Sequence, residues 1–271
     1  MKNISELIQY SNINKRDARY ILMCTLNIDN NTILTNSDTL VSDDDVAKFN
    51  SLIEQVSNGI PIAYVVSKAL FMGLNFYINN NVLIPRQETE QLVEEAIYYI
   101  KRSRVKSVLD MCTGSGCILI SIAYFTNIIG IGADISHNAI KVANKNANIN
   151  NLQSRLTFIQ GDLFENIKTK SDIIICNPPY IPTKHINFLE DSVKCYEPHI
   201  SLDGGLDGLL FYNKIAEQAS NYLFLNGIIF LEIGYNQANE VKRIFYEKGY
   251  ASVIIKKDYA GHDRIAIITY S

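Results

Sequence analysis

The tetrapeptide Asn177-Pro178-Pro179-Tyr180 follows directly on four apolar residues at 173–176. The apolar run is typical of a buried strand, and a plain turn after it would use Gly, Asn or Ser without an aromatic ring. Each proline fixes its own φ and restricts the residue before it, so the segment is a rigid rim at the end of a strand. The Asn177 amide and the Pro178 carbonyl can then face one small polar group, and Tyr180 can stack on a planar one. The segment therefore favours a site for a planar, polar group.

A glycine-containing turn, Thr113-Gly114-Ser115-Gly116, follows an earlier strand pattern that contains Asp110. Glycine in such a turn lets a nucleotide-like ligand approach the backbone at the carboxyl edge of a parallel sheet. The third glycine of a dinucleotide fingerprint is missing, with Leu119 in its place, which disfavours a nicotinamide dehydrogenase. By itself the turn is equally compatible with a purely structural role.

Acidic residues end the next two strand patterns. Asp134 closes the run 128–134, and an acid at that place can accept both hydroxyls of an adenosine ribose. A helix N-cap is the alternative for Asp134, but Ser136 is better placed to cap the helix that follows. Asp162 follows the run 155–160 and can accept the amino group of an adenine while Leu163 packs on the ring. Three successive strand ends thus present groups that fit one nucleoside.

Alternating strands and helices must bring these groups together. Strand patterns at 105–111, 128–134, 155–160, 172–176 and 227–234 are separated by helical patterns at 116–126, 136–149 and 206–223. A further helical pattern covers 236–248. This alternation predicts an α/β fold, a Rossmann-like sheet that is mostly parallel. The last two runs, 251–258 and 264–271, leave no room for a helix between them, so they predict an antiparallel C-terminal hairpin.

The chain begins with a different pattern. Residues 1–59 predict a small helical domain, in which Ser42 and Asp45 form a capping signal and Gly59 ends the last helix. Residues 60–85 alternate β-branched and aromatic side chains, which predicts a β-hairpin linker. Residues 86–271 then form the sheet domain, which opens with a helix rich in acidic residues.

Composition excludes several classes of protein. The 271 residues are 47% hydrophobic with a net charge of −3. These values indicate a globular protein whose main partner is not a nucleic acid. No apolar run is long enough to span a membrane. Five cysteines without a C-x-x-C pair indicate free thiols and a cytoplasmic location, and the four histidines lack the spacing of metal ligands.

Taken together, these motifs resemble the S-adenosyl-L-methionine-dependent methyltransferases that modify planar amino nitrogens. Three further segments narrow the resemblance to the PrmC/HemK family, the protein-(glutamine-N5) methyltransferases of peptide chain release factors. They are I-P-R-Q-E-T-E at 84–90, Y-E-P-H-I-S-L-D-G-G-L-D-G at 196–208 and K-D-Y-A-G-H-D-R at 257–264. The similarity covers both domains. Cys112 stands where the family usually has glycine, so its backbone must accept a Cβ.

The resemblance implies transfer of a methyl group from S-adenosyl-L-methionine to the glutamine of a Gly-Gly-Gln loop, leaving S-adenosyl-L-homocysteine. The acceptors would be class I release factors, onto which the helical domain would dock. The implied catalytic residues are Asn177, Pro178 and Tyr180, and Pro179 joins them in binding the substrate. The implied cofactor-binding residues are Cys112, Thr113, Gly114, Ser115, Gly116, Asp134, Asp162, Leu163 and Asn177.

Two other functions remain open on the residues alone. The same Asn-Pro-Pro-Tyr chemistry can methylate adenine N6 or guanine N2 in a nucleic acid whose base is flipped out. The slight acidic balance and the lack of a recognisable target-reading domain argue against it. A binding module that has lost catalysis is the second alternative, and the intact tetrapeptide at 177–180 argues against that one.

Overall fold

The computed structural model describes residues 2–270, which divide into two compact units. One unit comprises the chain up to Lys68 together with Glu190–Tyr196, and the other comprises Ala69–Leu189 and the chain from Glu197 onward. Within the described residues, no helix combines the length and the apolar character needed to cross a membrane.

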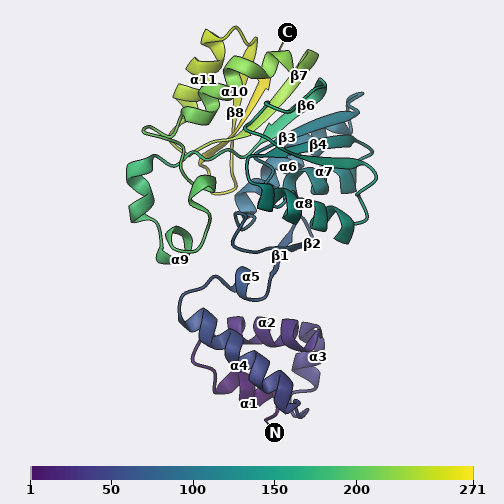
Figure 1. The fold of residues 1–271 in the computed structure, drawn as a ribbon, viewed down its shortest axis with the longest axis vertical. Coiled ribbons are helices and arrows are strands. Elements are labelled where there is room, and N and C mark those ends of the chain that lie inside the picture. The colour runs from purple at the N-terminus through teal and green to yellow at the C-terminus, as the bar shows by residue number, and fades with distance from the viewer. Residues whose placement is uncertain (1, 271) are drawn as a thin grey trace. The chain divides into compact units, whose positions relative to one another are not determined.

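The first unit is helical, which confirms the prediction for the N-terminal region. Its helices are α1 (Ile4–Gln9), α2 (Lys15–Leu26), α3 (Asn30–Thr35), α4 (Asp43–Ser57), α5 (Ile62–Val65) and α9 (Asp191–Lys194) (Figure 1). The capping signal is confirmed, because Ser42 Oγ accepts the Asp45 N–H at 3.1 Å. Leu22 on α2 and Phe49 on α4 are buried in a core that α1 and α3 complete.

A short hairpin follows this unit along the chain. Strands β1 (Lys68–Phe71) and β2 (Leu74–Tyr77) pair across a turn in which Met72 and Gly73 both have positive φ. The hairpin is shorter than the 60–85 range predicted for it, because 62–65 forms helix α5 despite its β-branched residues. Propensity for strand depends on context and is readily overridden. The buried Asn146 side chain accepts from Tyr77 N at 2.7 Å and donates to Tyr77 O at 3.0 Å, so it bonds to β2 as a neighbouring strand would.

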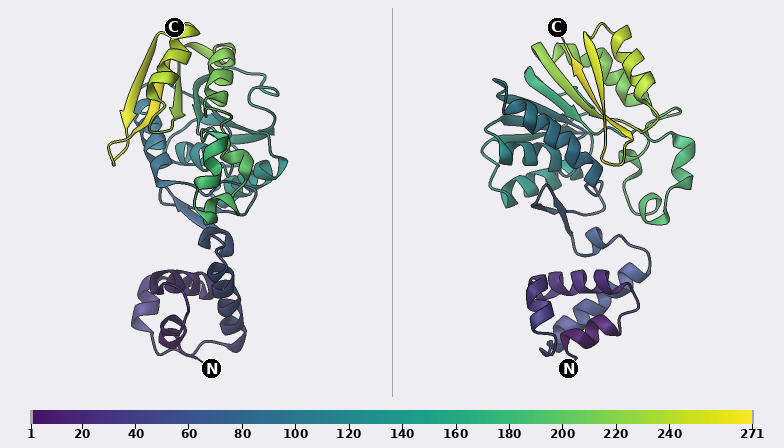
Figure 2. Two further views of the ribbon diagram at one scale, coloured as in Figure 1. Left: turned by 90° about the vertical axis from the view of Figure 1, so that its left-hand side faces the viewer. Right: turned by 180° about the vertical axis from the view of Figure 1, so that it is seen from behind.

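The main sheet has seven strands in the order β5-β4-β3-β6-β7-β9-β8 (Figures 1 and 2). The bounds are β3 (Ser107–Met111), β4 (Ile129–Asp134), β5 (Leu156–Gln160), β6 (Ser171–Cys176), β7 (Leu223–Glu232), β8 (Ser252–Lys257) and β9 (Asp263–Thr269). The pairs among β3 to β7 are parallel, and β9 runs antiparallel to both β7 and β8. The predicted α/β fold, with its antiparallel C-terminal hairpin, is confirmed.

Two layers of helices cover the sheet (Figure 1). One layer contains α6 (Gln87–Ile100), α7 (Cys117–Phe125) and α8 (His137–Ile149), and the other contains α10 (Leu210–Gln218) and α11 (Ala238–Glu247). The pattern at 206–223 predicted too long a helix for α10. Gly208 has a φ of +80°, which is incompatible with a helix, and Leu223 already belongs to β7.

The strand register sets the positions of the candidate residues. Met111 of β3 lies opposite Cys176 of β6, which lies opposite Leu231 of β7. The chain segments that follow these three residues therefore leave the sheet side by side at its carboxyl edge. The long connection from β6 to α10 contains two 3-10 helices, η1 (Thr183–Phe188) and η2 (His199–Ser201), and a third, η3 (Ala219–Asn221), follows α10.

Candidate functional site

A cavity of about 190 Å³ opens at the carboxyl edge of the sheet. The sequence-predicted residues that line it are Cys112, Gly114, Asp134, Asp162, Leu163, Asn177 and Pro179. They come from the ends of four neighbouring strands, β3 to β6. The parallel register therefore brings the glycine turn, both acids and the Asn-Pro-Pro-Tyr segment to one hollow.

The glycine turn leaves open space on its cavity side. Cys112 has a φ of +56° and Gly114 of +53°, in the left-handed region. A Cβ built on Gly114 would meet only the Cys112 carbonyl oxygen, at 3.9 Å. Cys112 carries a Cβ in this region, and such a conformation costs about 1–3 kcal/mol for a residue other than glycine.

The other residues of the turn serve the fold and do not line the cavity. Gly116 is the N-cap of α7 with a φ of +78°, and a Cβ there would lie 3.0 Å from Ile120 Cδ1. Thr113 is buried and donates to Asp110, while the Ser115 carbonyl accepts from Asn146 Nδ2 at 2.8 Å. The cofactor contacts expected of Thr113, Ser115 and Gly116 stay predictions.

Asp134 holds the turn in place. Its Oδ2 accepts the Gly114 N–H at 2.9 Å and its Oδ1 accepts the Ser136 N–H at 2.9 Å. Ser136 is the N-cap of α8, as predicted, because its Oγ accepts the Ala139 N–H at 3.2 Å. Burial raises the pKa of the Asp134 carboxyl, and the two backbone donors oppose that shift. The carboxylate is thus fixed at the cavity wall by backbone bonds.

The far wall combines a charge pair with apolar side chains. Asp162 Oδ2 lies 3.3 Å from Lys214 Nζ. Leu163 has a φ of +50°, and its side chain is buried. Phe211 and Lys214 of α10 also line the cavity. Sequence reasoning missed both, because a helical pattern does not reveal which side chains face a site.

Asp110 lies beneath the turn and is fully buried. Its Oδ2 accepts the Thr113 hydroxyl at 2.6 Å, whereas Oδ1 has no hydrogen-bond partner in the part of the chain that the structure describes. Burial raises the pKa of Asp110 to about 7, and the Thr113 hydrogen bond opposes that shift.

The Asn-Pro-Pro-Tyr segment is held from behind by buried groups. Asn177 Nδ2 donates to Thr89 Oγ1 at 3.1 Å, and Thr89 Oγ1 donates to Glu232 Oε2 at 2.6 Å. Tyr180 directs its hydroxyl to Glu232 Oε1 at 3.2 Å, and its ring does not line the cavity. The stacking role expected of Tyr180 therefore stays a prediction. Pro178 is buried and is also absent from the cavity wall.

Sequence reasoning did not identify Thr89 and Glu232. Thr89 lies in the first turn of α6, between Glu88 and Glu90, and acids at these positions are typical of a helix start. Glu232 ends β7, so it occupies the same kind of position as Asp134 at the end of β4. An acid at the end of a buried strand was the signal that could have identified it.

Another ion pair holds the segment just before α6. Arg86 Nη2 lies 2.5 Å from Glu197 Oε1, and Ile84 N donates to Glu197 Oε2 at 3.2 Å. The Glu197 side chain is only 1% exposed. This pair joins the 84–90 motif to the 196–208 motif.

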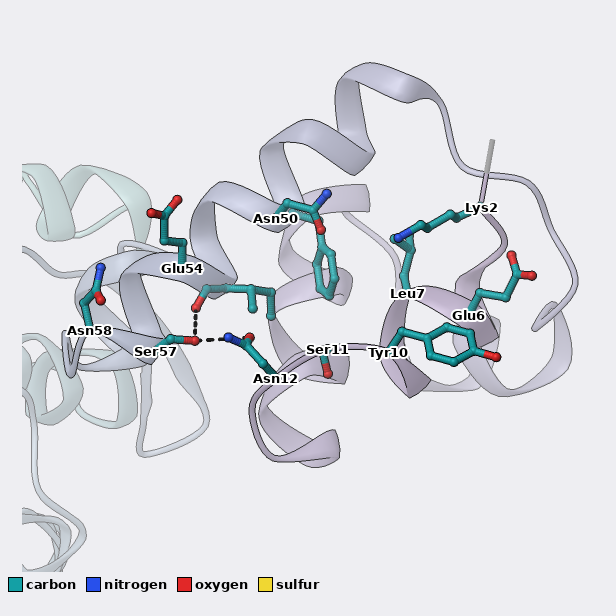
Figure 3. A pocket seen from close by; sticks show the side chains of 12 residues that line it. Lys2, Glu6, Leu7, Tyr10, Ser11, Asn12, Asn50, Glu54, Ser57 and Asn58 are labelled. Carbon is teal, nitrogen blue, oxygen red and sulfur yellow. Dashed lines mark hydrogen bonds between the residues drawn. The ribbon is translucent and has the colours of Figure 1, made fainter.

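A larger hollow, of about 350 Å³, lies in the helical unit (Figure 3). Side chains of α1 and α4 line it, among them the carboxylates of Glu6 and Glu54. It contains none of the predicted site residues and no glycine turn, so the candidate site is the cavity at the sheet edge.

The cavity fits an adenosine-type cofactor chemically. Two carboxylates suit hydroxyl and amino donors, Leu163 and Phe211 offer apolar surface, and the open side of Gly114 admits a ligand to the backbone. Among residues 2–270, no group of three or more His, Cys, Asp or Glu side chains is arranged to hold a metal ion.

Two family models match the chain. One, described as the PrmC N-terminal domain, matches residues 4–66, and one described as the Methyltransferase small domain matches residues 90–196. Among solved structures, a methyltransferase from Pyrococcus furiosus has a TM-score of 0.53 at 20% identity, over 80% of this chain and 96% of its own. At that identity the likeness shows the fold.

Curated relatives match nearly the whole chain. A release factor glutamine methyltransferase from Clostridium acetobutylicum is 39% identical over 255 residues, which are 93% of this chain and 90% of its own length. One from Clostridium botulinum is 42% identical over 256 residues, at 92% and 89% coverage. One from Thermodesulfovibrio yellowstonii is 37% identical, at 100% and 98% coverage. The chain therefore belongs to the release factor glutamine methyltransferase family.

Proposed function

We propose that the protein transfers a methyl group from S-adenosyl-L-methionine to the side-chain amide nitrogen of the glutamine in a release factor's Gly-Gly-Gln loop. One observation carries the proposal. Asn177 lines the same cavity as the open glycine turn and Asp134. An acceptor of amide hydrogens therefore lies beside the groups that suit the cofactor.

Asn177 would orient the acceptor nitrogen. An amide nitrogen is a poor nucleophile because its lone pair is delocalised into the carbonyl. Asn177 Oδ1 and the Pro178 carbonyl would accept its two N–H bonds, which draws the nitrogen toward a pyramidal geometry. When bound, the cofactor supplies a methyl group already activated by its sulfonium. Orientation of this kind can contribute about 7–11 kcal/mol to lowering a barrier.

The residues at the cavity wall would hold the cofactor. Asp134 would accept the ribose hydroxyls and Asp162 the adenine amino group, while Leu163 packs against the ring. Gly114 would give the ligand access to the backbone of the turn. The cationic sulfonium also suits the charge of the Asp134 carboxylate, whose hydrogen bonds come from backbone N–H groups.

The acceptor protein would contact the helical unit. The match to the PrmC N-terminal domain covers residues 4–66 of that unit, and the relatives are named for their action on release factors. The hollow between α1 and α4 (Figure 3) offers a polar surface there. No direct nucleic-acid partner is included in the proposal, since the net charge is −3.

Methyl transfer from radiolabelled S-adenosyl-L-methionine to a purified bacterial release factor tests the proposal. The matched control is the same factor with the loop glutamine replaced by glutamate, and total RNA and DNA serve as parallel acceptors. Label on the first factor and not on the second supports the proposal. Label only on nucleic acid would favour a base methyltransferase, and bound cofactor without label on any acceptor would favour a binding module.

A further inference from the structure

The buried carboxylate of Glu232 accepts one hydrogen bond from Tyr180, the last residue of the Asn-Pro-Pro-Tyr segment, and one from Thr89, which contacts Asn177, the first residue. Thr89 Oγ1, which contacts Asn177, lies 2.6 Å from Glu232 Oε2, and the Tyr180 hydroxyl lies 3.2 Å from Oε1. Glu232 is 1% exposed and Thr89 is 3% exposed. Glu232 directly follows Leu231, whose partner across the sheet is Cys176, so it leaves β7 beside Asn177.

The Glu232 carboxylate determines the direction of the two hydrogen bonds that link Asn177 to Thr89 and Thr89 to Glu232. The single hydrogen of the Thr89 hydroxyl is donated to Glu232 Oε2, and an ionised carboxylate can accept it but cannot donate in return. Burial raises the pKa of the Glu232 carboxyl, and the hydrogen bonds from Thr89 and Tyr180 together with the charge of Arg264 oppose that shift and favour the ionised form. The Thr89 oxygen can then only accept from Asn177, and it does so from Nδ2 at 3.1 Å. The nitrogen end of the Asn177 carboxamide is thereby held against α6. Its oxygen end, Oδ1, is left for the cavity that Asn177 lines.

We propose that Thr89 and Glu232 are positioning residues that determine which end of the Asn177 carboxamide faces the methyl acceptor. The inference rests on the proposed function, in which Asn177 accepts an N–H from the substrate amide. With the orientation reversed, Asn177 would present an NH₂ group to another NH₂ group, and the substrate would lose its acceptor. The chemistry of the site thus depends on two side chains that do not touch the substrate.

Selectivity between glutamine and glutamate follows from the same orientation. An Oδ1 atom that faces the substrate attracts an amide NH₂ and repels a carboxylate oxygen. A carboxamide free to rotate would present its NH₂ group to a carboxylate as readily as its oxygen to an amide. Loss of the Thr89–Glu232 chain should therefore reduce the preference for a glutamine-containing loop, in addition to slowing turnover.

The test uses the full chain with Thr89→Val, Thr89→Ser and Glu232→Gln variants. Valine matches the shape of threonine without the hydroxyl, serine retains the hydroxyl, and glutamine removes the acceptor-only carboxylate. Thr157→Val, at an exposed position on β5, is the matched control. Measurements are kcat and KM for the release factor, cofactor Kd, and inhibition by the factor with Glu in place of the loop Gln.

Thr89→Val and Glu232→Gln should each lower kcat by about tenfold or more, the size expected when a buried hydrogen bond is lost. Cofactor Kd should stay within about twofold, because Asp134 and the glycine turn are unchanged. The glutamate factor should inhibit both variants more strongly than it inhibits the wild type. Thr89→Ser and Thr157→Val should behave as the wild type does.

Three outcomes would overturn the inference. One is an unchanged kcat in Thr89→Val, and another is a Thr89→Ser variant as slow as Thr89→Val, since packing and not the hydroxyl would then matter. The third is unaltered inhibition by the glutamate factor. A wild-type protein that does not label the release factor would instead contradict the proposed function. Circular dichroism identifies any variant that fails to fold, and Thr89→Val keeps the inference testable if Glu232→Gln unfolds.

Discussion

Asp134 Oδ2 accepts the backbone N–H of Gly114 at 2.9 Å, which joins the end of β4 to the turn after β3. The same carboxylate takes the Ser136 N–H through its other oxygen. One side chain thus fixes the shape of the glycine turn and presents its charge at the cavity wall. Its proposed contact with a ribose would add to a structural role already in place.

Asp134→Ala is expected to lower both stability and cofactor affinity. The half-buried Gly114 and Ser136 N–H groups lose their acceptor, and each lost hydrogen bond costs about 0.5–1.5 kcal/mol. Urea unfolding measures the loss of stability, and calorimetric titration measures the cofactor Kd. Weaker cofactor binding without a change in the free energy of unfolding would show that water replaces the carboxylate at the turn.

Gly116→Ala is expected to destabilise the protein more than Gly249→Ala does. Both glycines have positive φ, +78° and +84°, and the left-handed conformation alone costs about 1–2 kcal/mol for an L-residue. A Cβ on Gly116 would also lie 3.0 Å from Ile120 Cδ1 and 3.2 Å from Ala143 Cβ, whereas nothing lies within 4 Å at Gly249. Denaturant midpoints of the two variants make the comparison. Equal losses of stability in the two variants would mean that α7 moves to accommodate the added Cβ at no further cost.

Asn177→Ala is expected to reduce turnover by about a hundredfold while cofactor Kd changes little. The substitution removes the proposed acceptor of the substrate N–H, an interaction that matters for reaching the transition state. The cofactor's proposed contacts at Asp134 and Asp162 remain. Single-turnover methyl transfer and equilibrium titration separate the two quantities. An equal loss in both would reassign Asn177 to cofactor binding.

The sequence predicts local features better than long-range ones, and the site illustrates why. The Ser42 and Ser136 caps depend on residues three apart, and both are found. The strand patterns place Asp134, Asp162 and Asn177 at one edge because parallel strands end together. The Thr89–Glu232 bond instead joins residues 143 apart, and no local pattern encodes which helix start packs on which strand end. The orientation of Tyr180 toward Glu232 was unpredictable for the same reason.

Asp110 should make stability depend on pH over a defined window. Burial raises its pKa from the ordinary 3.8 to about 7, so between these values the native state keeps a proton that the unfolded state has lost. The contribution of Asp110 to stability is therefore fully present below about pH 4 and declines as pH rises to about 7.

The Asp110→Asn variant tests this prediction because its side chain has no such proton to lose. The free energy of unfolding of the variant minus that of the wild type should increase from pH 4 to 7 and level off above. Urea titrations of both proteins at matched pH values measure it. A difference that is independent of pH would mean that Asp110 titrates near its ordinary value, and that the unpartnered Oδ1 atom is solvated in solution.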